Sequence, residues 1–294
     1  MESRKVRLRL HHDLALDGRL RKPGMRSVEQ AVAEAVAADP RLLAGKVFAF
    51  ATSVIRDAPN RDEVIDRVAR TTGVRLRVLP GEEEARLAYV AARQWAASRR
   101  PGRAPGELLV LDIGGGTLEV AAGDGDDPRA VLSLPLGARR VTRDALPGGV
   151  ASSPRELARV RRCLRRSLRA VPELPRAAED GRTLACSKTF TQLARLAATL
   201  KSGPRSSRSP QRLTLAGVRA AIPVLAGTDV ADRAKLAGIS AHRAEQTLAG
   251  ALVAEALMEA CAVRAVTICP WSTREGLLLE ALGATAAHRG GRAA

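Results

Sequence analysis

The sequence predicts an α/β protein from two observations: strand-like and helix-like segments alternate along the chain, and the apolar content is large enough for a substantial core. Short apolar or alternating segments are typical of strands, and amphipathic segments are typical of helices. The expected strands cover residues 5–10, 47–51, 74–79, 108–111, 117–123, 130–134, 183–186 and 265–268. The expected helices cover residues 27–38, 60–71, 81–97, 153–170, 213–225, 228–236 and 241–261, with further helices after residues 187 and 270. Such alternation defines the α/β class.

The composition indicates an aliphatic core. Of the 294 residues, 46% are hydrophobic but only 2% are aromatic, so Val, Leu and Ala have to fill the interior. A chain of this length corresponds to one large domain or to two of ordinary size. No apolar run reaches the roughly 18 residues needed to span a bilayer, and no signal-like start is visible, so we expect a cytoplasmic protein without a membrane partner.

The chain is strongly basic, with a formal net charge of +17 from 48 Lys and Arg against 31 Asp and Glu. Such a field favours polyanionic partners or substrates. Biased composition explains many individual arginines equally well, and we interpret the arginine face of the helix expected at 153–170, with Arg161 and Arg165, as a solvated surface rather than a polyanion track. The four cysteines have no paired spacing, which argues against a zinc site or a disulfide framework.

The central segment of the chain is residues 108–122, LLVLDIGGGTLEVAA, in which a fully apolar strand ends at Asp112. Gly114, Gly115 and Gly116 follow. Because glycine has no Cβ, these residues can adopt positive φ and bring backbone N–H groups close to a bound anion. The segment therefore predicts two strands joined by an anion-binding turn. A plain glycine hairpin between two core strands is the alternative that three glycines alone leave open.

A second strand is expected to begin at Thr117. Its alternation places Glu119 on the same side as Thr117 and opposite to Leu118 and Val120. The carboxylates of Asp112 and Glu119 would then lie beside the glycine turn. Carboxylate oxygens next to a phosphate-binding turn are suited to a hard cation such as Mg²⁺.

Two earlier segments carry further candidate residues. The strand expected at 47–51 delivers Arg56 to its carboxyl end, where ligands usually bind in open α/β sheets. The helix expected at 81–97 has Glu84 and two other glutamates in its first turn. Acidic residues are favourable at a helix N-terminus through the helix dipole, so two of these three glutamates need no other explanation.

Several segments, in order, resemble the exopolyphosphatase and guanosine pentaphosphate phosphohydrolase (Ppx/GppA) family. The segments are FATSVIRDAPN, LPGEEEARLAY, LDIGGGTLEV, SLPLGARRVT, SKTFTQLARL, DRAKLAGISAHRAEQTLAGALVAEALM and CPWSTREGLLLE. They span nearly the whole chain. Several motifs in family order are far more specific than a single glycine motif.

The resemblance implies an actin-like fold of two domains (ASKHA, ribonuclease H-like) with the active site in the cleft between them. We expect a first domain over residues 1–104, a second over 105–285 with its phosphate loop at 112–119, and a disordered tail at 286–294. The resemblance to the family also implies Mg²⁺-assisted hydrolysis of terminal phosphoanhydrides, with inorganic polyphosphate or guanosine pentaphosphate as substrate. Homodimers are common among members of the family.

The resemblance assigns roles to individual residues. Glu84 matches the glutamate that activates the attacking water as a general base. Asp112 and Glu119 match the carboxylates that hold Mg²⁺ or order its water shell. Backbone groups of Gly114 to Thr117 match a phosphate loop, and Arg56 matches an arginine near the phosphate path, where a guanidinium can pair phosphate oxygens.

The sequence departs from the family pattern in two ways. Family members begin with a strand, a D-x-G-S-N-S phosphate loop and a second strand, and nothing of that kind precedes residue 5, so we expect a first domain without its first two strands. The missing loop would be half of a two-loop phosphate clamp. Leu118 also replaces the usual Thr, and Cys186 replaces a small or hydroxyl residue; we expect both to alter detail and leave the chemistry intact.

Three functional hypotheses follow. The first is an enzyme that releases terminal phosphate from polyphosphate or the 5′ phosphate of guanosine pentaphosphate. The second is a catalytically impaired member that binds polyphosphate or guanosine alarmones in a regulatory role, which the absent first loop makes credible. The third is a nucleic-acid binder, which the low aromatic content and the lack of a recognition motif make a distant alternative.

Overall fold

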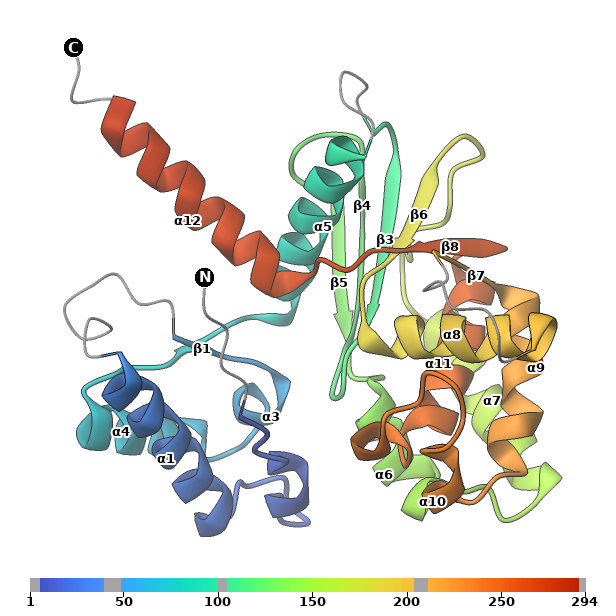
Figure 1. Cartoon of the computed structure of the whole chain (residues 1–294), viewed down its shortest axis with the longest axis horizontal. Coiled ribbons are helices and arrows are strands. Elements are labelled where there is room, and N and C mark those ends of the chain that lie inside the picture. The colour runs from blue at the N-terminus through green and yellow to red at the C-terminus, as the bar shows by residue number, and fades with distance from the viewer. Residues whose placement is uncertain (1–5, 40–48, 100–104, 204–210, 291–294) are drawn as a thin grey trace. The chain divides into compact units, whose positions relative to one another are not determined.

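The computed structural model describes residues 6–39, 49–99, 105–203 and 211–290 (Figure 1). Contacts divide the chain into two units, Met1–Pro80 (unit 1) and Gly81–Ala294 (unit 2). The helix that follows Pro80, which we expected in the first domain, therefore groups with unit 2. The predicted boundary at residue 104 lies outside the described residues and stays a prediction.

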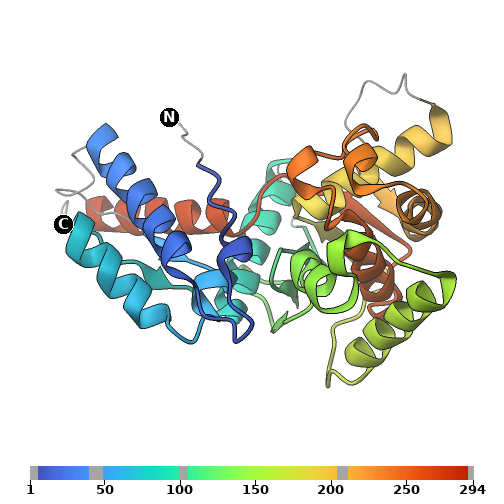
Figure 2. The same ribbon diagram turned by 90° about the horizontal axis from the view of Figure 1, so that it is seen from below.

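Unit 1 combines helices with a short parallel sheet. Its described elements are η1 (Leu10–Asp13), α1 (Lys22–Ala38), β1 (Phe50–Ala51), α3 (Ser53–Arg56), α4 (Arg61–Thr72) and β2 (Arg77–Val78). Strands β1 and β2 pair in parallel, with Phe50 opposite Arg77. Helices α1 and α4 pack side by side (Figure 2) and bury apolar side chains between them, among them Met25, Val28, Val64 and Val68.

Two local predictions in unit 1 are wrong. The strand expected at 5–10 does not form: residues 6–9 have no regular structure, Arg9 is in the left-handed region at φ 49°, and Lys5 lies outside the described residues. An alternating segment becomes a strand only when a neighbouring strand can pair with it, and the described sheet of unit 1 contains β1 and β2 alone. Helix α1 begins at Lys22 rather than near Ser27, because Pro23 occupies its first turn, where the fixed φ of proline suits a helix start.

Unit 2 is built on a mixed sheet. Its described strands lie in the order β5 (Ala130–Leu134), β4 (Leu118–Gly123), β3 (Leu108–Ile113), β6 (Arg182–Ala185), β8 (Ala265–Ile268) and β7 (Arg212–Thr214). Strands β3, β6 and β8 run parallel, and the other neighbours pair antiparallel. The strands predicted over this half of the chain are thus confirmed, those at 130–134 and 265–268 to the residue.

Helices cover both faces of this sheet (Figure 1). Helix α5 (Gly81–Ser98) packs on one face, against Leu108, Val110 and Ala121. The opposite face packs Leu109, Leu111 and further side chains against a second group of helices, formed by α8 (Lys188–Ser202), α9 (Leu215–Ala226) and α11 (Thr247–Ala260). Alternate residues of β3 therefore face opposite layers, as the period of two in a strand requires.

The remaining described elements of unit 2 pack on these layers. They are α6 (Ala138–Ala145), η2 (Pro147–Gly149), α7 (Pro154–Arg169), α10 (Val230–Arg233), η3 (Ala241–Arg243) and α12 (Thr273–Gly290). Helices α6 and α7 pack against α11, and α12 packs along α5. Helix α12 extends to Gly290, so the tail expected to be disordered from residue 286 is helical up to that point, and residues 291–294 lie outside the described range.

Helix α7 confirms one prediction and corrects another. The hydroxyl of Ser153 accepts a hydrogen bond from the N–H of Glu156, as expected of an N-cap residue. Its arginine face is not simply solvated, because Arg161 pairs with Glu255 and Arg165 with Glu259, both on α11. Part of the positive charge of α7 is therefore neutralised where the two helices pack.

Candidate active site

Three carboxylates predicted to act in the site lie on one side of the sheet of unit 2. Asp112 on β3 is the register partner of Glu119 on β4. Because Leu108 and Val110 face α5 and the residues between them face the other layer, the alternation directs Asp112 toward the α5 side. Glu119 has the same orientation by the same argument, and Glu84 lies in the first turn of α5. The charge of Glu84 contributes to raising the pKa of Glu119, as expected of carboxylates on the same side of the sheet.

Burial and mutual repulsion make the two strand carboxylates hard to ionise. Burial raises the pKa of Asp112 to about 6, against the lowering effects of a hydrogen bond from Ser272 and of the charge of Arg243. Burial also raises the pKa of Glu119 to about 8, and the neighbouring charge of Asp112 adds to the effect. Two carboxylates that resist ionisation next to each other form a site where a cation would be stabilised.

Hydroxyl groups orient both carboxylates. The Oγ of Ser272 donates a hydrogen bond to Oδ2 of Asp112 at 2.5 Å, and the Oγ of Ser133 donates to Oε1 of Glu119 at 3.1 Å. The N–H of Ser272 in turn donates to Glu275 at 2.9 Å. Sequence reasoning missed both serines. The available signal for Ser272 was its place just after β8, at the carboxyl end of a strand that runs parallel to β3 by way of β6.

The turn between β3 and β4 is held by the start of helix α6. The N–H groups of Gly137, Ala138 and Arg139 donate to the carbonyl oxygens of Gly116, Gly114 and Gly115, at 3.1, 3.0 and 2.9 Å respectively. The approach is so close that a Cβ on Gly137 would lie 2.5 Å from the carbonyl carbon of Gly115. Gly137 is thus required by the packing of α6 on the turn, a role that sequence reasoning did not assign.

This arrangement fixes the direction of the free N–H groups. In a trans peptide the C=O and N–H bonds point in opposite directions, and the chain contains no cis peptide bond among its described residues. Because the carbonyls of Gly114, Gly115 and Gly116 point at α6, the N–H groups of Gly115, Gly116 and Thr117 point away from it. No described residue accepts a hydrogen bond from these three N–H groups. They form a backbone anion cradle, which we call the N–H cradle.

Arg56 lies in unit 1, at the end of α3. Its Nη1 donates a hydrogen bond to the carbonyl of Leu79 at 2.9 Å, and its Nε pairs with Asp57 at 3.1 Å. These contacts fix the side chain within unit 1. The predicted contact of Arg56 with phosphate stays a prediction, as do the roles of the other site residues.

The donor set fits Mg²⁺. In the ranges that the structure describes, no group of three or more His, Cys, Asp or Glu side chains is arranged to hold a metal ion. Mg²⁺ does not require such a group, since it is usually bound by one or two carboxylates together with water and substrate phosphates. Asp112 and Glu119, side by side and close to the N–H cradle, are the residues that would hold it.

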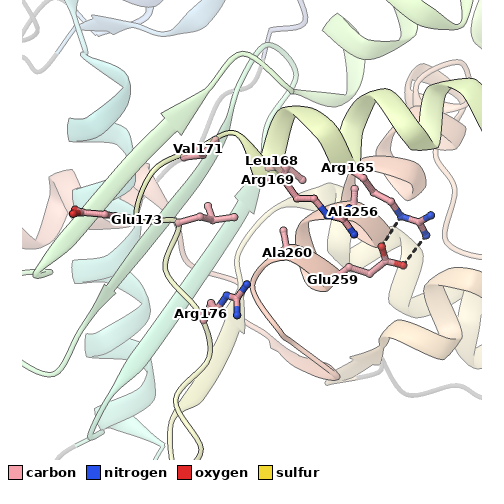
Figure 3. A pocket seen from close by; sticks show the side chains of 10 residues that line it. Arg165, Leu168, Arg169, Val171, Glu173, Arg176, Ala256, Glu259 and Ala260 are labelled. Carbon is pink, nitrogen blue, oxygen red and sulfur yellow. Dashed lines mark hydrogen bonds and ion pairs between the residues drawn. The ribbon is translucent and has the colours of Figure 1, made fainter.

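A separate pocket lies on unit 2, between α7, α11 and the segment that follows α7 (Figure 3). Its volume is about 460 Å³, and its lining includes Arg165, Arg169, Arg176 and Glu259. None of the predicted site residues lines it. The pocket is therefore distinct from the carboxylates and the N–H cradle.

A glycine turn with free N–H groups beside a pair of buried carboxylates is an arrangement suited to holding a phosphate together with a cation. The chain belongs to the Ppx/GppA phosphatase family, whose model matches residues 1–285. This confirms the membership that the sequence motifs predicted. No helix among the described residues is long and apolar enough to cross a membrane.

Known relatives agree with this membership. Exopolyphosphatase 1 of Mycobacterium bovis is 42% identical over 290 residues, which cover 97% of this chain and 81% of the relative. The guanosine-5'-triphosphate,3'-diphosphate pyrophosphatase of Aeromonas hydrophila is 25% identical over 82% of this chain and 46% of its own length. The crystal structure of the Aquifex aeolicus member of the Ppx/GppA family superposes with a TM-score of 0.72 at 24% identity, over 94% of this chain and 86% of that one. The fold is the actin-like two-domain fold expected for the family.

Proposed function

We propose that this chain is a Mg²⁺-dependent phosphohydrolase that releases terminal phosphate from inorganic polyphosphate. The observation that carries the proposal is the N–H cradle beside Asp112 and Glu119, with Glu84 near them. The relative named exopolyphosphatase, 42% identical over nearly the whole of this chain, supports polyphosphate as the substrate. Guanosine pentaphosphate is the second candidate substrate, supported by the more distant relative from Aeromonas hydrophila.

Different residues of the chain bind the phosphate and the metal ion. The N–H groups of Gly115, Gly116 and Thr117 hold oxygens of the terminal phosphate by hydrogen bonds that need no side chain. Asp112 and Glu119 would hold Mg²⁺, which when bound would neutralise the charge on the phosphate oxygens. Phosphoryl transfer depends mainly on such positioning and charge neutralisation rather than on a covalent intermediate with the protein.

Glu84 acts as the general base. It accepts a proton from the water that attacks the terminal phosphorus, while the bond to the bridging oxygen breaks and the shortened chain leaves. Its position is fixed by the first turn of α5 and by a hydrogen bond that the hydroxyl of Thr273 donates to its backbone carbonyl at 3.4 Å. A carboxylate on a rigid helix can act in this way without moving.

The test is Glu84→Gln, assayed for phosphate release from long-chain polyphosphate in the presence of Mg²⁺. Removal of a general base is expected to lower kcat by roughly 10²- to 10⁴-fold while binding of polyphosphate is retained. Glu82→Gln is the matched control, because Glu82 lies in the same helical turn and is exposed. Equal activity of the two variants would remove Glu84 from the mechanism.

The same assay separates the two candidate substrates and the regulatory alternative. Faster turnover of guanosine pentaphosphate than of polyphosphate would reverse the assignment of substrate. If the unaltered chain bound polyphosphate but released no phosphate from either compound, the catalytic proposal would be overturned. The catalytically impaired, regulatory reading would then replace it.

A further inference from the structure

The side chain of Arg139 lies directly against the glycine turn. A Cβ built on Gly115 would fall within 3.0 Å of Nε, Cζ and Nη2 of Arg139, closer than real Cβ atoms approach another atom. The guanidinium therefore occupies the space that any side chain at position 115 would take. A side chain at position 115 would have to displace the flexible end of Arg139 from the turn.

The backbone brings Arg139 to the turn. Arg139 is the second residue of α6, and its N–H donates to the carbonyl of Gly115 at 2.9 Å. Long side chains in helices point back toward the helix N-terminus, which for Arg139 is the end of α6 that meets the turn. Both the backbone N–H and the guanidinium of Arg139 therefore contact the turn.

The positive charge of Arg139 has no counter-charge within the part of the chain that the structure describes. No hydrogen bond and no ion pair from its guanidinium to a described residue is present. The side chain is half-buried, and this partial removal from water lowers the pKa of Arg139. The next residue differs, because Nε of Arg140 donates to the carbonyl of Gly116 at 3.1 Å.

A partly buried cation without a partner is unfavourable unless an anion completes it. The turn beside Arg139 also has three N–H groups without acceptors among the described residues, so two independent sets of hydrogen-bond donors lie at the glycine turn. A guanidinium can bind two oxygens of one phosphate, or oxygens of two successive phosphates, with its planar fork of donors. The ligand that satisfies both sets is a phosphate or a chain of phosphates.

We propose that Arg139 is a substrate-binding residue that pairs with phosphate oxygens held at the N–H cradle. The inference rests on the proposed function for the identity of the substrate, and only on the geometry of the turn for the chemistry of the ligand. It extends the phosphate site from backbone donors to a charged side chain that sequence reasoning did not single out.

The experiment compares Arg139→Met and Arg139→Lys with the unaltered protein. Binding of tripolyphosphate is measured by titration calorimetry without Mg²⁺, and kcat and KM for polyphosphate are measured with Mg²⁺. Arg139→Met is expected to weaken tripolyphosphate binding by roughly 10- to 100-fold, the effect of losing hydrogen bonds to a charged group. Arg139→Lys restores part of the affinity, because the charge is kept and the fork geometry is lost.

The matched control is Arg143→Met. Arg143 lies on the same helix, is exposed, and pairs with its neighbour Asp144 at 2.7 Å. Arg143→Met removes the same charge as Arg139→Met but at a position away from the turn. The affinity of this variant for tripolyphosphate should therefore stay close to that of the unaltered protein. Thermal unfolding of all variants shows whether the fold is intact, and Arg139→Lys gives the comparison if Arg139→Met is unstable.

The outcomes separate this inference from the proposed function. Equal tripolyphosphate affinity of Arg139→Met, Arg143→Met and the unaltered protein would overturn the role of Arg139, whether or not polyphosphate is hydrolysed. A loss of affinity confined to the Arg139 variants supports it even if no phosphate is released. If the Arg139 variants lose affinity and no phosphate is released, the proposed hydrolysis is overturned but the phosphate-binding role of Arg139 is supported.

Discussion

At the scale of single residues, the hydroxyl of Ser272 sets the orientation of Asp112. The two residues are 160 positions apart in the chain, yet Oγ and Oδ2 are 2.5 Å apart. The N–H of Ser272 donates to Glu275, which holds the serine in place in turn. Partners that orient a metal-binding carboxylate influence the site nearly as much as the ligand itself.

We predict that Ser272→Ala weakens the use of Mg²⁺. The Mg²⁺ concentration for half-maximal phosphate release should rise by roughly 10- to 100-fold, because Asp112 loses the donor that fixes its carboxylate. A titration of activity against Mg²⁺ measures the shift. Ser98→Ala is the control, since Ser98 is exposed and its hydroxyl donates to the carbonyl of Trp95 in its own helix. An unchanged Mg²⁺ dependence in Ser272→Ala would contradict the prediction.

The site residues that the sequence predicted differ in kind from those that it missed. The shared orientation of Asp112 and Glu119 follows from the period of a strand and could be read from spacing alone. The roles of Ser272 and Arg139 could not be predicted in this way. Ser272 contacts Asp112, and Arg139 contacts the glycine turn, only after the sheet and α6 have packed. Gly137 belongs with them, since a close approach between two segments leaves no pattern in either one.

At the scale of elements, the packing of α12 along α5 is what holds Glu84. A Cβ on Gly276 would fall within 3.0 Å of the carbonyl carbon of Leu87 in α5, so the two helices meet at a distance that only glycine allows. Thr273, three residues earlier, donates to the carbonyl of Glu84. The first turn of α5 is therefore positioned by the start of α12.

We predict that Gly276→Ala destabilises unit 2 and lowers activity together. The added methyl group forces α12 away from α5, and overpacking of this kind typically lowers the free energy of unfolding by about 1 to 3 kcal/mol. Gly283→Ala in the same helix is the control, because a Cβ there would meet nothing within 4 Å. It should be neutral or stabilising by up to about 1 kcal/mol through helix propensity. Chemical denaturation and phosphate release measure the two effects, and equal stability of the two variants would rule out the close contact.

The accuracy of the predicted elements also depended on their neighbours. Strands β5 and β8 and the N-cap of α7 agree with prediction because local pattern and tertiary pairing favour the same structure. The segment expected as a strand at 5–10 has the pattern but no described partner strand, so it stays irregular over residues 6–9. A strand is a property of a pair of segments, whereas a helix can be recognised from one.

At the scale of the whole molecule, the net charge of +17 bears on how a polyanion is captured. Some of this charge is locally paired, as in the contacts of α7 with Glu255 and Glu259 on α11. The remainder contributes a long-range field that attracts anions and weakens with salt, since the Debye length is about 10 Å at 0.1 M. A long phosphate chain interacts with more of that field than a short one.

We predict that salt raises the KM for long-chain polyphosphate more than the KM for tripolyphosphate. Between about 50 mM and about 300 mM KCl, the ratio of the two KM values should rise several-fold, because screening removes the long-range attraction while contacts at the N–H cradle persist. Steady-state kinetics at fixed free Mg²⁺ measure the ratio. A ratio independent of salt would mean that the surface charge has no part in substrate capture.

The hydrogen bonds between α6 and the glycine turn have a consequence for electrostatics. A bound phosphate would be linked through the N–H groups of the turn to peptide units whose carbonyls are bonded to the first turn of α6. Peptide dipoles aligned in series polarise one another. The peptide groups of the turn therefore extend the positive potential at the N-terminus of α6 as far as the bound anion. Amide groups do not titrate near neutral pH, and this contribution to phosphate affinity therefore depends on the charge of the phosphate and not on the protonation of any side chain.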